Sequence, residues 1–150
     1  MLRGVRMNAV HVLPPITVST RDFERLVTFG LDAYLRGDAH ADFLLSELTR
    51  ATLCPPRRLP RQVVSVNTRV IYRFDSEPGF RAHLLVRPLD LTGSGDELSA
   101  ASPLGAALLG LRVGDRMPFC DNRSGGQHTV MVEGIGWQWT EGKPSGPPNR

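Results

Sequence analysis

The spacing of apolar residues changes once along this chain, and the change divides it into two parts. From Ser19 to Thr52, apolar side chains recur every three or four residues, which is the period of a helix with one buried face. From Val64 to Phe74 and from Phe80 to Val86 they alternate with polar residues, which is the period of a half-buried strand. The segment 55–61 between them (Pro-Pro-Arg-Arg-Leu-Pro-Arg) is too rich in proline for either element. We therefore predict an α+β protein with helices first and an antiparallel sheet after them.

The first part predicts two helices. One covers about 19–36, with Ser19 or Thr20 as its N-cap and Gly37 at its end. The second covers about 39–52 and ends before the ring of Pro55. Because the link between these amphipathic helices is short, they should pack antiparallel as a hairpin. At 1.5 Å per residue the two helices would span roughly 25 Å and 20 Å.

The second part predicts four strands and one short helix. Ser102 followed by Pro103 is a favoured helix start, and Gly110 would end this helix. The apolar phase of the last strand shifts by one residue, which predicts a β-bulge near Gly134 or Gly136. The strands are expected at 64–74, 80–86, about 117–119 and about 128–139, with turns at 78–79 and 124–126.

Charge and cysteine content limit the classes of partner. The formal net charge is +3, but Pro14–Trp139 holds fourteen basic and fourteen acidic side chains, so the excess belongs to the two ends. A basic composition is therefore a weak argument for nucleic-acid binding here. Cys54 and Cys120 lack metal-ligand spacing and predict reduced thiols in a cytoplasmic protein, a single disulfide being the less favoured alternative. No apolar run approaches the ~20 residues that cross a bilayer, so no membrane partner is expected.

Several segments resemble the GreA/GreB-like family of transcription elongation factors. The run Ser102–Asp115 (Ser-Pro-Leu-Gly-Ala-Ala-Leu-Leu-Gly-Leu-Arg-Val-Gly-Asp) is similar to a signature of the C-terminal domain of Gre transcript-cleavage factors. Val64–Val70 resembles the opening strand of that domain, and Gly125-Gly126 its last hairpin. Leu48–Pro55 looks more specifically like the regulator of nucleoside diphosphate kinase. The resemblance covers about 16–139 and implies an FKBP-like sheet domain.

The patterns and the resemblance together predict the organisation of the chain. The expected units are a flexible lead at 1–13, a helical hairpin at 14–54, a linker at 55–62, a Gre-like C-terminal domain of FKBP-like fold at 63–140 and a disordered tail at 141–150.

The resemblance also implies RNA polymerase as the partner, bound at the rim of its secondary channel. In Gre proteins this contact belongs to the loop before the short helix, which corresponds here to Ala101, Ser102, Pro103 and Leu104. Ala101 stands where some Gre proteins have an acid. From the residues alone, Ser102-Pro103 is equally an ordinary helix cap, and both roles can hold.

The hairpin is expected to be too short for catalysis. Gre factors place carboxylates beside the polymerase's Mg²⁺ on a hairpin about twice as long as the one predicted here. At the tip, Asp38, His40 and Asp42 could hold a metal, but Asp38 suits an N-cap and Asp42 a first-turn acid. We expect a non-enzymatic regulator without metal or cofactor that competes with Gre factors. The alternative is a polymerase-dependent transcript-cleavage factor that uses Asp38 and Asp42.

The basic linker gives a third hypothesis, a nucleic-acid contact through Arg57, Arg58 and Arg61. We favour a solvated linker because the folded body carries no net charge by count. The expectation is thus a cytoplasmic monomer with no sequence-specific nucleic-acid binding.

Overall fold

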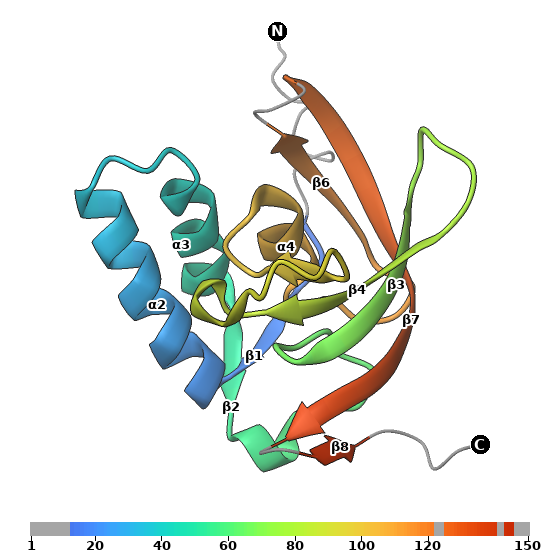
Figure 1. Cartoon of the computed structure of the whole chain (residues 1–150), viewed down its shortest axis with the longest axis horizontal. Coiled ribbons are helices and arrows are strands. Elements are labelled where there is room, and N and C mark those ends of the chain that lie inside the picture. Colours follow the sequence, from blue (N-terminus) through green and yellow to red (C-terminus); the bar gives the residue numbers. More distant parts are fainter. Residues whose placement is uncertain (1–12, 122–124, 141–142, 146–150) are drawn as a thin grey trace, which may run out of the picture.

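The computed structural model describes residues 13–121, 125–140 and 143–145. A pair of helices stands beside a curled sheet, and a short helix lies between them (Figure 1). The predicted α+β class, with the helical hairpin first, is confirmed. The predicted lead at 1–13 falls outside the described residues except for Leu13, as do 141–142 and 146–150 of the predicted tail.

The helical hairpin consists of α2 (Thr20–Leu35) and α3 (Ala41–Arg50). Ser19 is the N-cap of α2, as predicted, and its hydroxyl accepts a hydrogen bond from the backbone N–H of Asp22 at 3.1 Å. The two helices pack closely at Gly30, where an added Cβ would lie 2.8 Å from Cδ2 of Leu45. With 16 and 10 residues the helices span about 24 Å and 15 Å, somewhat less than expected.

Two short strands hold the base of the hairpin. Strand β1 (Thr17–Ser19) comes directly before α2, and β2 (Thr52–Cys54) follows α3. They pair in parallel, as Figure 1 shows beneath the helices. The backbone N–H of Thr17 also donates to the carbonyl of Gly110 at 3.1 Å, which joins this base to the loop after the short helix. The sequence patterns did not predict β2.

The sheet is mostly antiparallel and curls around the short helix α4 (Pro103–Leu108) (Figure 1). Its strand order is β5-β4-β3-β7-β6, and β4 and β5 form its one parallel pair among the described residues. The long strand β7 joins the sheet together, because it pairs with β3 on one edge and with β6 on the other. The strands are β3 (Thr68–Phe74), β4 (Arg81–Val86), β5 (Glu97–Ser99), β6 (Arg116–Asp121) and β7 (Gly126–Thr140).

Three details differ from the expected strands. Strand β5 (Glu97–Ser99) was not predicted, since it has only three residues and forms by pairing with β4. The strand predicted from Val64 begins only at Thr68, because Asn67 has a positive φ of 69° and Val64 pairs with Leu111 in the loop after α4 instead. Within the predicted disordered tail, Lys143–Ser145 forms β8, which pairs with the end of β7. A strand can form there because β7 extends to Thr140 and offers its backbone groups.

The predicted β-bulge is confirmed. The register between β3 and β7 shifts twice: Val70 faces Ile135, but Tyr72 faces Val132. A second shift lies between Thr68 and Val70, opposite the segment that contains Gly136. Extra residues on one strand bend and twist it, so these shifts account for the curl of β7. The predicted turn at 124–126 is described only from Gly125 onward, since Ser124 lies outside the described residues.

The hairpin and the sheet share one hydrophobic core. Leu44 and Leu48 of α3 and Leu108 of α4 are each no more than 1% exposed. Gly110 ends α4 with φ +83°, and an added Cβ would lie 2.7 Å from that of Ile16, so the chain from the two parts meets closely here. The core also contains Leu26, Val70, Tyr72, Leu85, Leu109, Met117 and Val130.

An ion pair between buried Glu47 and partly exposed Arg50 adds to this connection. The guanidinium of Arg50 donates to both carboxylate oxygens of Glu47, with the shortest distance 2.8 Å, and the Glu47 side chain is only 3% exposed. Arg50 also donates to the carbonyl of Pro14 at 2.7 Å. The end of α3 is therefore bound to the segment that enters β1.

The cysteines form no disulfide: Cys54 is half-buried and Cys120 exposed, and both are free. No described helix is both long and apolar enough to cross a membrane.

Candidate functional site

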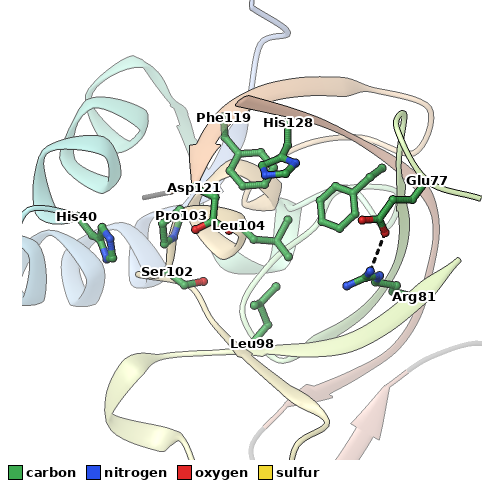
Figure 2. Close-up of a pocket in the computed structure, with 11 residues that line it drawn as sticks. His40, Glu77, Arg81, Leu98, Ser102, Pro103, Leu104, Phe119, Asp121 and His128 are labelled. Carbon is green, nitrogen blue, oxygen red and sulfur yellow. Dashed lines mark hydrogen bonds and ion pairs between the residues drawn. The ribbon is translucent and has the colours of Figure 1, made fainter. Parts of the chain in front are cut away.

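A cleft of about 570 Å³ opens between the end of the hairpin, the start of α4 and the ends of several strands (Figure 2). This volume lies in the range of ordinary ligand pockets. Its lining comes from α4, from β3 to β7 and from the residue before α3. The lining residues are His40, Phe74, Glu77, Arg81, Leu98, Ser102, Pro103, Leu104, Phe119, Asp121 and His128.

Three rings form an aromatic cluster on one side of the cleft: Phe74, Phe119 and His128. Their centroids lie 6.2 Å apart for the two phenylalanines, 5.6 Å for Phe74 and His128, and 5.4 Å for Phe119 and His128. Leu98 and Leu104 extend this apolar surface. The aromatic cluster gives the cleft a surface suited to apolar side chains.

The positively charged side chain of Arg81 lies beside the aromatic cluster. The guanidinium carbon of Arg81 is 5.1 Å from the centroid of Phe74, within the range of a cation–π contact. Arg81 also donates to the carboxylate of Glu77 at 2.7 Å, the pair marked in Figure 2. The positive charge of Arg81 is thus already balanced within the lining.

The start of α4 is held by hydrogen bonds among its own residues. The hydroxyl of Ser102 donates to the carbonyl of Ser99 at 2.7 Å and accepts from the N–H of Gly105 at 3.0 Å. The hydroxyl of Ser99 accepts from the N–H of Ala101 at 3.0 Å. The helix cap predicted for Ser102 is therefore confirmed, and the cap presents Ser102, Pro103 and Leu104 to the cleft.

We expect Ser102→Ala to lower the free energy of unfolding by about 1 kcal/mol, because it removes the cap of α4. Urea denaturation of both proteins would measure this. Ser46→Ala is the matched control, since Ser46 is exposed within α3 and its loss should be nearly neutral. Equal destabilisation by the two substitutions would contradict a capping role for Ser102.

The end of the hairpin contributes one residue to the cleft, His40. Asp38 is not the N-cap of the second helix, which corrects the prediction. The residue before α3 is His40, and the carboxylate of Asp38 instead accepts from the N–H of His40 at 2.9 Å. Asp42 lies in the first turn of α3, as predicted. Asp38 and Asp42 are exposed and lie outside the lining of the cleft.

The basic segment lies apart from the cleft. Arg57 and Arg58 belong to a 3₁₀ turn at Pro56–Arg58 directly after β2, and Arg61 follows it. All three are exposed, and none lines the cleft. In Figure 1, β2 leads away from the turn that joins α2 to α3. The structure therefore does not bring these arginines together with the other predicted site residues.

A partly buried histidine, His83, lies beside the aromatic cluster. Nδ1 of His83 is 2.9 Å from the hydroxyl of Tyr72, which packs edge-on against Phe74. Burial lowers the pKa of His83 below its ordinary value of 6.5, and the nearby guanidinium of Arg81 acts in the same direction. Asp96 opposes this shift.

We expect acidification below about pH 6.5 to destabilise the fold through His83. The unfolded chain then takes up a proton that the folded chain binds less tightly, so stability present above 6.5 is lost as the pH falls through the lower folded-state pKa. Urea denaturation of wild type and His83→Gln at pH 7.5 and 5.5 would test this. The wild type should lose more stability than the variant, and equal losses would show that His83 is not responsible.

The sequence identified only part of this cleft. Ser102, Pro103, Leu104 and His40 were predicted as site residues from two separate arguments, and the structure brings them to one cavity. Ala101 lies just outside it. The aromatic cluster and the residues Glu77, Arg81, Leu98 and Asp121 were not predicted as site residues. Phe119 is buried in the hydrophobic core and Phe74 packs against it, so nothing in the sequence distinguishes these two from ordinary core residues.

Among the described residues, no group of three or more His, Cys, Asp and Glu side chains is arranged to hold a metal ion. The cleft combines an apolar surface, a rigid helix start and a few charges, which is an arrangement for binding.

The sequence and the fold are similar to those of known proteins. Residues 14–53 match the family model described as Rnk N-terminus. The chain is 42% identical over 102 residues to the regulator of nucleoside diphosphate kinase of Escherichia coli (strain K12) and to that of Shigella flexneri, covering 68% of this chain and 75% of each relative. The structure is similar to the prokaryotic transcription elongation factor GreA/GreB from Nitrosomonas europaea, with a TM-score of 0.63 and 32% identity. That match covers 80% of this chain and 98% of the other.

Proposed function

Because this chain belongs to the GreA/GreB-like family, among the regulators of nucleoside diphosphate kinase, we propose that it regulates transcription by binding RNA polymerase. The contact is at the rim of the secondary channel, where the protein competes with Gre factors. Ala101, Ser102, Pro103 and Leu104 form its polymerase-binding segment.

The observation that carries this proposal is the open, rigid start of α4. Ser102, Pro103 and Leu104 line a cleft of about 570 Å³, and the Ser102 hydroxyl is bonded on both sides. Side chains that are already fixed lose little conformational entropy on binding, which favours a docking role. The segment also has the sequence by which the chain resembles the Gre factors.

The short hairpin supports a regulator without catalytic activity. Its longer helix spans about 24 Å, roughly half of what the Gre mechanism uses. The carboxylate of Asp38 already accepts a hydrogen bond within the turn, and Asp42 stands in the first turn of α3. We propose that these acids shape the end of the hairpin and that the protein acts by occupying the channel rim, as a cytoplasmic monomer.

The test is binding of the full-length protein to core RNA polymerase. We expect a complex at micromolar concentration and displacement of a bound Gre factor as the protein is titrated. Absence of a complex at micromolar concentration would refute the proposal.

The same complexes separate a regulator from a cleavage factor. Backtracked elongation complexes should show no shortened RNA when this protein is added, while a Gre factor serves as the positive control. Cleavage by the wild type that Asp38→Ala abolishes would establish an enzyme instead.

A further inference from the structure

The arginine side chains in the described part of the chain divide into two groups. Six of them form an ion pair with a carboxylate: Arg36, Arg50, Arg73, Arg81, Arg87 and Arg116. Seven others form no ion pair with a described residue: Arg21, Arg25, Arg57, Arg58, Arg61, Arg69 and Arg112. The positive charge that is available to a partner therefore belongs to the second group.

Four arginines of the second group follow the paired strands at the base of the hairpin. Strands β1 and β2 run parallel, with Ser19 opposite Cys54, so the chain leaves both strands at the same end. Figure 1 shows the start of α2 and the turn after β2 at this end, away from the turn that joins α2 to α3. These two segments carry Arg21, Arg25, Arg57 and Arg58.

Two more arginines extend this surface. Arg61 follows the 3₁₀ turn, and two residues later Val63 forms an antiparallel bridge with Arg112. The chain then passes beside α2, where the backbone N–H of Val66 donates to the carboxylate of Asp22 at 3.4 Å. The six side chains are all exposed, and we call them the basal arginines: Arg21, Arg25, Arg57, Arg58, Arg61 and Arg112.

Positive charge exceeds negative charge at this end of the molecule. Besides the six basal arginines, the segments 20–25, 55–63 and 111–115 hold three charged side chains: Asp22, Glu24 and Asp115. Two of these carboxylates are already bound to backbone. Asp22 accepts from Val66, and Asp115 accepts from the backbone N–H of Arg112 at 2.9 Å. Six positive charges against three negative ones leave an excess of three, although residues 14–139 are neutral by count.

We propose that the basal arginines bind the phosphate backbone of duplex DNA without regard to its sequence. A guanidinium can donate two hydrogen bonds to one phosphate, and contacts to phosphates carry no sequence information. The basal arginines are exposed and spread over three segments, so they suit a row of phosphates better than a single enclosed anion. This inference goes beyond the proposed function, because it does not require polymerase.

The position of the aromatic residues favours a duplex over a single strand. Proteins that bind single strands combine positive charge with aromatic side chains on which the bases stack. Among the described residues, the exposed aromatic side chains are Tyr34, near the end of α2, and Phe80, directly before β4. Neither belongs to the segments of the basal arginines. The basal surface therefore offers contacts to a backbone and no stacking platform from the described residues.

Binding of the full-length protein alone to a labelled duplex of mixed sequence tests the proposal. Fluorescence anisotropy would measure the association constant over a range of salt concentrations. We expect its logarithm to fall with the logarithm of the salt concentration with a slope of about −4, as for about five phosphate contacts. A duplex that does not bind at low salt would refute the proposal.

Charge reversal tests the position of the contact. Arg57→Glu combined with Arg61→Glu should weaken binding to the duplex at least about tenfold and reduce the salt slope by about 2. The control combines Arg36→Glu with Arg87→Glu, which changes the net charge equally, but these arginines already bind a nearby aspartate. The control should bind nearly like wild type, and thermal melting verifies that both double variants are folded.

Both double variants keep the basic residues at the two ends of the chain, so these residues cannot account for a difference between them. Equal losses of affinity would mean that net charge matters and its position does not, which would overturn the proposal.

Competition identifies the kind of anion. Single-stranded RNA with the same number of phosphates and polyglutamate with the same net charge are each titrated against the labelled duplex. Unlabelled duplex should displace the label at the lowest concentration, because its charge density is the highest. RNA that competes equally well would overturn the assignment to a duplex. Polyglutamate that competes equally well would mean that the surface fits an acidic protein instead.

The proposed function and this inference can fail separately. The basal arginines share no residue with the lining of the cleft, so Arg57→Glu with Arg61→Glu should bind core polymerase without DNA as the wild type does. A wild type that binds no polymerase refutes the proposed function, whatever its affinity for DNA. A wild type that binds polymerase but no duplex leaves the proposed function standing and overturns this inference.

Discussion

Gly105→Ala should destabilise the protein by about 3 kcal/mol or more, although alanine is the better helix former. An added Cβ would lie 1.9 Å from the carbonyl oxygen of Ser99 and 2.8 Å from its carbon. The clash is with backbone, and this backbone is not free to move because its carbonyl accepts from both the N–H and the hydroxyl of Ser102. The start of α4 must shift, and the segment that we propose to bind polymerase shifts with it.

Urea denaturation and polymerase binding would measure the two consequences of Gly105→Ala. Gly134→Ala is the control, because its added Cβ would meet nothing closer than 3.7 Å. We expect the control to retain stability and binding. A Gly105→Ala protein that unfolds at the wild-type urea concentration would show that α4 can shift away from Ser99 at little cost.

Arg50→Met should cost about 3 kcal/mol, because it leaves the carboxylate of Glu47 buried without its cation. The Glu47 side chain is 3% exposed and has Arg50 as its partner through three hydrogen bonds. The substitution also removes the bond from Arg50 to the carbonyl of Pro14 at 2.7 Å.

A double variant separates the lost charge pair from lost packing. Glu47→Gln combined with Arg50→Met removes both charges, so it should be more stable than Arg50→Met alone. Thermal and urea denaturation of wild type, both single variants and the double variant would complete the cycle. A double variant that is less stable than Arg50→Met would mean that the stranded charge is not what destabilises the single variant.

Elements that are determined by a few neighbouring residues could be predicted from the sequence. Ser102 and Pro103 define the start of α4 through capping and a fixed φ, and both act within one turn. The hairpin followed from apolar periodicity and a short link. The α+β class followed from the change of period.

The remaining features depend on partners far away in the sequence. Strand β2 has three residues, too few to show a period, and it exists because β1 lies beside it. An acid and an arginine three positions apart on a helix usually predict a surface pair, and only tertiary packing buries Glu47. Asp38 was predicted to be the N-cap of the second helix, but the N-cap lies two residues later, at His40.

The cleft shows the same limit. Its two groups of predicted residues, His40 and Ser102–Leu104, came from unrelated arguments, and nothing in the sequence indicated that they would meet. They meet because α3 and α4 pack in one core and because the bulges in β7 curl the sheet toward them. The aromatic cluster depends on this curl, since its rings come from β3, β6 and β7.

The parallel pairing of β1 with β2 closes the base of the helical hairpin, which we call the arm. Both helices of the arm are connected to this pair of strands. Thr17 lies opposite Thr52 and Ser19 opposite Cys54, so the pairing includes no residue of either helix. The same number of whole helical turns could therefore be added to or removed from α2 and α3 without changing the pairing of β1 with β2. Arm length can thus change while the pairing of β1 with β2 stays the same, but each added turn would move His40 away from the cleft that it now lines.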